Sequence, residues 1–179
     1  MSSLGRLLRG VRAGGHRSRL ARIDVPETMV VTSDAFDDGG TIPVECAGKG
    51  VGDNRSPALH WSGMPGGTDA LVLIIEDDDV PLPRPLTHTI AILDPRTDHI
   101  DAGALQPIST EIRFIKTPLG QGYSGPRPIP GHGCHHYRFH LFALNAPVPA
   151  TVGTKGRLLR SMSEHAIARG TLTGVYQRP

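Results

Sequence analysis

Short apolar segments that end at Gly, Pro, Asp or Asn organise most of this chain, a pattern typical of strands joined by turns. The clearest segment, ALVLIIED (70–77), is a continuous apolar run that ends in acids, which predicts a strand buried on both faces. THTIAIL (87–93) is expected to pair beside it, with the proline-rich VPLPRPL between them as a loop. Further strands are expected in MVVTSDAF, TIPVEC and ALHW, around Ile112–Ile115, from His135 to Leu144, and in TLTGVYQ.

One long helix is expected near the end of the chain, from about Gly156 to Arg169. Gly170 is placed for a left-handed C-terminal cap. Many strands with one late helix predict a mainly β domain, a two-sheet β-sandwich with the C-terminal helix packed at one end. The apolar stripe of this helix would consist of Leu158, Leu159, Met162 and Ala166.

The first 27 residues form a basic segment that differs from the rest of the chain. Residues 1–22 contain six arginines and no acid, which leaves 13 basic and 17 acidic residues beyond them and argues against a general nucleic-acid surface. A short helix with an apolar stripe of Leu4, Leu7, Leu8 and Val11 fits this segment but is too short to be stable alone. We expect residues 1–27 to be flexible or docked on a second subunit. Docking on the body of the chain, a membrane-surface helix and an organelle-targeting sequence are the alternatives. Residues 28–179 are predicted to form a single domain.

Cellular location is indicated by the apolar runs and the cysteines. No run approaches the ~18 to 20 apolar residues that span a bilayer. Two cysteines, Cys46 and Cys134, imply no disulfide framework and a reduced compartment. We therefore expect a cytoplasmic protein.

Candidate chemistry gathers in GPRPIPGHGCHHYRF (125–139), where a proline-stiffened turn leads into a strand. Strand alternation puts His135 and Tyr137 on one face, and an imidazole beside a phenol suits a small anion. Asp77 ends its predicted strand and His88 opens the next, so these side chains could also meet, with the carboxylate favouring the imidazolium. Each feature has a plainer interpretation: Asp77 could belong to a solvated acidic turn, and His88 could be a core histidine. We nevertheless predict a phosphate-sized pocket, gripped by side chains because no phosphate-loop motif is present.

The sequence also offers two other kinds of site. The cluster His132, Cys134, His135, His136 and His140 could bind zinc, but strand alternation would separate its members, so we predict neither a metal nor another cofactor. An enzyme is the second alternative, a hydrolase that uses Asp77 with His88 or His135 as general acid and base on a small ester. Because no G-x-S-x-G nucleophile motif accompanies them, we prefer binding without an obligatory reaction.

Three separated motifs together resemble the phosphatidylethanolamine-binding proteins, in their bacterial and archaeal Raf-kinase-inhibitor-like branch. They are SPALHWSGMPGGTDALVLIIEDDDVP, GPRPIPGHGCHHYRFHLFAL and EHAIARGTLTGVYQR, and the resemblance extends collinearly over residues 28–179. It implies that family's β-sandwich and an anion pocket, whose ligand we expect to be phosphate, a phosphomonoester, a carboxylate or a phospholipid head group. A kinase or protease partner and a homodimer are also implied. By resemblance, the ligand-binding residues would be Asp77, His88, His135 and Tyr137, with Gly125 and Pro126 at the rim.

The sequence departs from the family pattern at three positions. Asp78 stands where the family's Asp-Pro-Asp-Ala-Pro motif has its first proline, Thr89 replaces a tryptophan, and His136 replaces an arginine. These changes predict a less positive mouth and weaker affinity for a doubly charged head group. The family often has a cis peptide at the position of Val80–Pro81, and a proline makes such a bond accessible.

Overall fold

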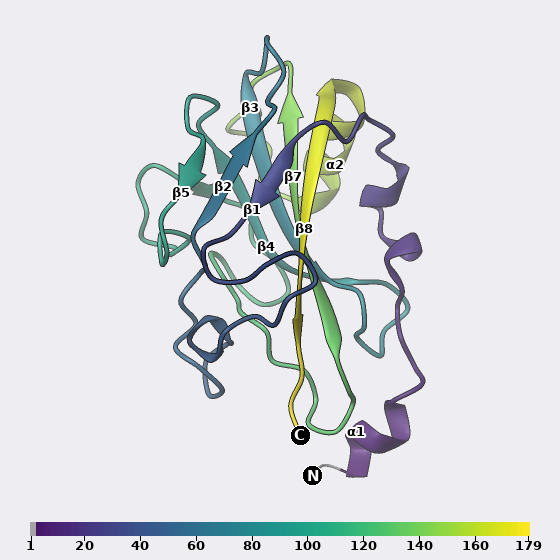
Figure 1. Cartoon of the computed structure of the whole chain (residues 1–179). Helices are drawn as coiled ribbons and strands as arrows, with labels where there is room; N and C mark the ends of the chain where they lie inside the picture. Colours follow the sequence, from purple (N-terminus) through teal and green to yellow (C-terminus); the bar gives the residue numbers. More distant parts are fainter. Residues whose placement is uncertain (1–2) are drawn as a thin grey trace.

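Two antiparallel sheets form the domain in a computed structural model that describes residues 3–179 (Figure 1). The smaller sheet has the order β1-β2-β5 and the larger has the order β6-β4-β3-β7-β8. The strands are β1 (Val30–Thr32), β2 (Leu59–Ser62), β3 (Ala70–Asp77), β4 (Leu86–Leu93), β5 (His99–Ile100), β6 (Arg113–Phe114), β7 (His135–Leu144) and β8 (Ala166–Tyr176). The helices are α1 (Ser3–Leu8) and α2 (Lys155–His165), with 3₁₀ turns η1 (Gly15–Arg17), η2 (Leu20–Arg22) and η3 (Val44–Cys46). The predicted mainly β sandwich is confirmed.

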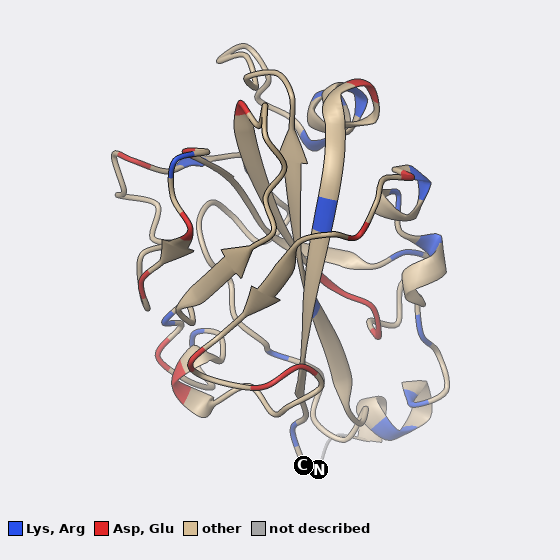
Figure 2. Ribbon diagram, turned by 45° about the horizontal axis from the view of Figure 1, so that its top comes forward, with Lys and Arg blue, Asp and Glu red and all other residues tan. Residues whose placement is uncertain are grey.

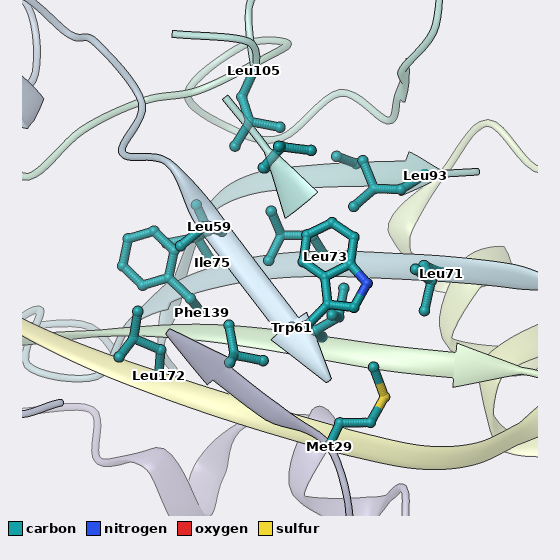
Figure 3. Packing of buried hydrophobic residues seen from close by; sticks show 14 of the residues in the cluster. Met29, Leu59, Trp61, Leu71, Leu73, Ile75, Leu93, Leu105, Phe139 and Leu172 are labelled. Atoms are coloured by element: carbon teal, nitrogen blue, oxygen red, sulfur yellow. The ribbon is translucent and has the colours of Figure 1, made fainter. Parts of the chain in front are cut away.

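Strand β3 is the centre of the larger sheet and is buried along its whole length. Its odd-numbered residues, such as Leu71 and Leu73, face the smaller sheet, from which Trp61 of β2 reaches toward them (Figure 3). Its even-numbered residues, such as Val72 and Ile74, face the outer layer formed by α2 and the N-terminal segment. The continuous apolar run is therefore explained by two separate apolar layers, as predicted for a strand covered on both faces.

The C-terminal helix is shorter than the sequence predicted and lies against the outer face of the larger sheet. Thr154 caps its start by accepting a hydrogen bond from the backbone N–H of Arg157 (3.4 Å). The helix ends at His165, and the chain continues directly into β8, which pairs with β7 along its length. The prediction that the helix continues to Arg169 is wrong, because pairing with β7 outweighs the local helical pattern. Gly170 lies inside β8 rather than at a cap, where a Cβ atom would come within 2.4 Å of the Met29 carbonyl oxygen.

Other boundaries also differ from the expectations. The segment TIPVEC forms the turn η3 rather than a strand, and the expected strand in MVVTSDAF is limited to β1. Strand β5 was not predicted. These elements are two to three residues long, so tertiary contacts rather than a sequence period determine them. The strands over 70–77 and 135–144 have the predicted bounds.

The N-terminal segment lies along the body of its own chain (Figure 1). Backbone N–H groups of Ala13 and Gly14 donate to the carbonyl oxygens of Val80 (3.0 Å) and Asp78 (2.8 Å). Farther along, Leu20 and Ile23 are buried in the outer apolar layer. Residues 3–23 run beside the β3–β4 loop and the outer face of the larger sheet. Docking of this segment on a second subunit stays a prediction.

The expected apolar stripe of this segment is mostly solvent-exposed. Leu4, Leu7 and Val11 are 53%, 80% and 49% exposed. Helix α1 contacts the body through its backbone at Gly5. A Cβ atom at this position would come within 2.0 Å of the Pro130 carbonyl oxygen, so the close approach requires glycine. Within residues 3–179, no helix has the length and apolar character needed to cross a bilayer.

Candidate functional site

Three neighbouring strands place four of the predicted side chains at one end of the larger sheet. Asp77, the last residue of β3, lies directly opposite Tyr137 of β7, and His135 precedes Tyr137 by two residues on the same face. On the other side of β3, the pairing register skips His88 between Thr87 and Thr89. This bulge near the start of β4 turns the His88 ring toward Tyr137, with ring centroids 5.3 Å apart. The four side chains therefore converge, as the sequence predicted.

Asp77 pairs with His135 rather than with His88. Nδ1 of His135 lies 2.8 Å and 3.0 Å from the two carboxylate oxygens of Asp77. On its other side, Nε2 of His135 lies 2.7 Å from Nδ1 of His132, and Nε2 of His132 lies 2.8 Å from the carbonyl oxygen of Leu8. All three side chains are almost completely buried. The chain of contacts runs from the N-terminal helix to the end of β3.

The hydrogen bonds of this chain determine its charge. The Leu8 carbonyl only accepts hydrogen bonds, so Nε2 of His132 must carry a hydrogen, and a second hydrogen must lie between Nδ1 of His135 and the Asp77 carboxyl group. The bond between the two rings requires a third hydrogen, whereas two neutral imidazoles carry only two. Asp77, His135 and His132 therefore hold one hydrogen more than a carboxylate and two neutral imidazoles would. The buried group of three is neutral overall.

His88 is the histidine that keeps a ring nitrogen free for a ligand. Its Nδ1 donates to the carbonyl oxygen of Ser124 (2.8 Å), so Nε2 is the nitrogen left for a partner. Burial lowers the pKa of His88, although the Asp77 carboxylate opposes this effect. The neutral ring is thus the resting form near neutral pH, and it offers an acceptor at Nε2.

A cavity of about 280 Å³ opens beside these groups. Apolar side chains form most of its wall, and the polar lining comes from Asp77, His88, His135, Ser124 and Arg127. The complete lining is Asp77, Val80, Pro81, Leu82, Leu86, His88, Leu119, Ser124, Gly125, Arg127, Pro128, Ile129 and His135. The cavity therefore combines a polar end with an apolar wall.

The rim is held in place by a close backbone contact. A Cβ atom at Gly125 would lie 2.0 Å from the carbonyl oxygen of Cys46, so only glycine fits this position. The Gly125 N–H donates to Oδ1 of Asn54 (2.9 Å), which removes it from the donors available to a ligand. Of the two expected rim residues, Gly125 lines the cavity and Pro126 does not.

Tyr137 lies behind the cavity rather than on its wall. It is 1% exposed, stacks on the His135 ring at 6.4 Å and contacts the edge of His88. Its hydroxyl has no hydrogen-bond partner among the described residues. Burial, together with the nearby Asp77 carboxylate, raises the pKa of Tyr137 well above its ordinary value. The phenol is therefore a neutral group that positions the two imidazole rings.

The two acids that follow Asp77 interact with basic groups outside the cavity. Burial on its own would raise the pKa of Asp79, but hydrogen bonds from His136 and Arg12 outweigh it and lower that pKa. Asp78 lies 2.5 Å from Nε of Arg138, and burial raises its pKa to about 6 despite this cation. Neither residue lines the cavity, so the sequence-based expectation that Asp78 makes its mouth less positive is wrong. The described residues contain no cis peptide bond, and Val80–Pro81 is therefore trans.

Several functional contacts were not anticipated from the sequence. The roles of His132, the Leu8 carbonyl and Asn54 depend on segments far apart along the chain. His132 alone had a local signal, because it lies three residues before His135 in GHGCHH. The histidines of that motif do not form a metal cluster, since no group of three or more His, Cys, Asp or Glu residues suited to a metal ion occurs in residues 3–179. Cys46 and Cys134 are both free.

Comparisons with known proteins agree with this architecture. The family model described as phosphatidylethanolamine-binding protein matches residues 32–177. A UPF0098 protein from Pyrococcus abyssi is 34% identical over 158 residues, which cover 85% of this chain and 87% of the relative.

Solved structures show the same fold. A phosphatidylethanolamine-binding protein homologue from Chlamydia trachomatis has a TM-score of 0.75 at 32% identity and covers 86% of this chain and 99% of its own. E. coli YbcL has a TM-score of 0.77 at 24% identity, with coverage of 85% and 99%. A carboxypeptidase Y inhibitor, solved in complex with its cognate proteinase, shares the fold alone at 15% identity and a TM-score of 0.57, with coverage of 86% and 85%. The chain belongs to the phosphatidylethanolamine-binding protein family, in its bacterial and archaeal UPF0098 branch.

Proposed function

We propose that the cavity between His88 and His135 binds a small anion that carries an apolar group, such as a phosphomonoester or a phospholipid head group. The observation that carries this proposal is the free Nε2 of His88 in a cavity whose buried carboxylate is already neutralised. An uncompensated Asp77 would repel an anion at this distance. The extra hydrogen held by Asp77, His135 and His132 removes that repulsion.

His88 couples ligand binding to proton uptake. The neutral ring accepts at Nε2, so it binds the protonated form of a phosphate or carboxylate, or takes up a proton and donates to the ionised form. Either route adds one proton to the complex. Because burial lowers the pKa of free His88, binding should strengthen as the pH falls.

The apolar wall favours an ester over inorganic phosphate. Val80, Leu86 and Ile129 lie on it, and these side chains cannot hydrogen-bond to phosphate oxygens. An alkyl group attached to the anion would bury apolar surface against them. Arg127 at the mouth, whose guanidinium donates to the Lys49 carbonyl oxygen (3.3 Å), adds a positive charge near the entrance.

The test is a titration of O-phosphorylethanolamine, inorganic phosphate and acetate by NMR or calorimetry at pH 5.5 and 7.5. We expect tighter binding at pH 5.5, and a loss of on the order of tenfold or more in His88→Ala because a charge-assisted hydrogen bond disappears. His135→Ala should also weaken binding, since it exposes the anion to an unbalanced Asp77.

His99→Ala is the matched control, because His99 is an exposed histidine on β5 of the other sheet. Its affinity should equal that of the wild type. Equal affinity of wild type and His88→Ala for all three anions would refute the proposed site.

Other functions gain less support from this site. Both ring nitrogens of His135 are engaged, which leaves Nε2 of His88 as the free imidazole nitrogen for a hydrolase. Because no nucleophile motif accompanies His88, we favour binding over the hydrolase alternative. Regulation of a kinase or protease stays a prediction. A proteinase is bound by the distantly related carboxypeptidase Y inhibitor, with which this chain shares only the fold.

A further inference from the structure

Five arginine side chains converge on a second concavity, outside the site between His88 and His135. Its volume is about 420 Å³, and it lies between the N-terminal segment, the β3–β4 loop and α2. Figure 2 shows Lys and Arg along the N-terminal segment and on α2. The lining consists of Arg17, Arg19, Arg22, Ile23, Arg84, Leu159, Arg160 and Ser163, and we call it the arginine groove.

None of these five arginines has an acidic partner among the described residues, in contrast to four arginines outside the groove. Arg12, Arg96, Arg138 and Arg169 each form an ion pair with an aspartate or glutamate. Among the described residues, none of the five guanidinium groups of the arginine groove makes an ion pair or a side-chain hydrogen bond, and no acid lines the groove. Like charges gathered in one concavity repel each other. The arrangement therefore favours an anion that interacts with several guanidinium groups at once.

The groove has a fixed apolar base. Ile23 is 5% exposed and belongs to the outer apolar layer, against which Leu159 of α2 also packs. The backbone segments that carry the arginines are thereby held in place, even though the arginine side chains themselves are exposed. Arginines on a fixed backbone lose less conformational entropy on binding than arginines on a flexible tail would.

The lining also limits the class of ligand. It contains no aromatic side chain on which a nucleobase could stack, and a hollow of this size suits a small molecule better than a flat membrane surface. Guanidinium groups bind phosphate groups through paired hydrogen bonds. We propose that the arginine groove binds a small molecule carrying two or more phosphate groups, independently of the anion site at His88.

Isothermal titration calorimetry with inorganic tripolyphosphate at pH 7.5 and physiological salt tests this proposal. We expect the double variant Arg22→Gln/Arg160→Gln to weaken binding by on the order of tenfold or more, because each lost guanidinium removes charge-assisted hydrogen bonds. Both side chains are exposed, so the variant should fold, and circular dichroism checks this.

Two control variants make the result specific. Arg55→Gln removes one charge from an exposed arginine near Gly103, outside the groove, and should leave tripolyphosphate affinity unchanged. His88→Ala should also leave it unchanged, whereas O-phosphorylethanolamine binding should be lost only in His88→Ala. This pattern separates the groove from the other site.

Three results would overturn the proposal. The first is full tripolyphosphate affinity in the double variant. The second is equal loss in Arg55→Gln and a single groove variant, Arg22→Gln, which would indicate a general charge effect. The third is binding of vesicles containing anionic lipid, lost in the double variant, without measurable binding of tripolyphosphate, which would make the groove a membrane contact.

Discussion

Replacing Asp77 with alanine is expected to lower the free energy of unfolding by about 1 to 3 kcal/mol, because it leaves Nδ1 of the buried His135 ring without a hydrogen-bond partner. The rings of His135 and His132 are both almost fully buried, so water cannot replace the lost carboxyl group. Urea denaturation at pH 7, followed by the fluorescence of Trp61, would measure the loss. Trp61 is the only tryptophan and is 6% exposed in the core.

The exposed pair Asp98–His99 offers a matched control for the buried pair. Nδ1 of His99 lies 2.8 Å from Oδ1 of Asp98, the same separation as between Nδ1 of His135 and Oδ2 of Asp77. Both side chains of the exposed pair, however, are more than half exposed. Asp98→Ala should therefore have no measurable effect on stability. If Asp77→Ala unfolded at the same urea concentration as the wild type, the buried Asp77–His135 hydrogen bond would contribute nothing to stability.

The second large effect is expected from pH, through His140. Burial lowers the pKa of His140 to about 4, whereas the unfolded chain takes up this proton near 6.5. Between these values the unfolded state binds more protons, so stability must fall as the pH falls from about 6.5 to 4. This difference in the pKa of His140 between the folded and unfolded states corresponds to about 3 kcal/mol in the free energy of unfolding. Above pH 7 the contribution should be constant.

The comparison of wild type with His140→Gln isolates this contribution. Glutamine keeps a polar group near the Thr171 hydroxyl, which lies 3.1 Å from Nδ1 of His140, and it does not titrate. The stability of wild type relative to this variant should decrease steadily below pH 6.5. The comparison is needed because Asp78, whose pKa burial raises to about 6, acts in the opposite direction as the pH falls. His99→Gln serves as an exposed control, and a pH-independent difference between wild type and His140→Gln would contradict the prediction.

Strand prediction succeeded where the local pattern was strong. The apolar run over residues 70–77 and the alternating segment from His135 have the bounds that were expected, since each pattern repeats over eight or more residues. The end of α2 was mispredicted because EHAIARG has apolar residues at helical spacing and also suits a strand. The segment Ala166–Tyr176 pairs with β7, and this long-range pairing makes the segment a strand rather than a continuation of the helix.

Convergence of the candidate site was also predictable, but its hydrogen bonds were not. Asp77, His88, His135 and Tyr137 meet as expected from strand order and alternation. The choice of His135 as partner of Asp77 depends on the pairing register and on the bulge at His88, which local sequence does not reveal.

The amino-acid pattern by itself determined the strand-rich sandwich, the doubly buried central strand and the face shared by His135 and Tyr137, because each follows from a repeat within one segment. Only the tertiary structure decided that His132 and the Leu8 carbonyl complete the buried charge network, and that arginines from three segments gather in one groove. These features require residues up to 143 positions apart, Arg17 and Arg160, to lie together, and such proximity arises from the packing of the N-terminal segment and α2 on the larger sheet.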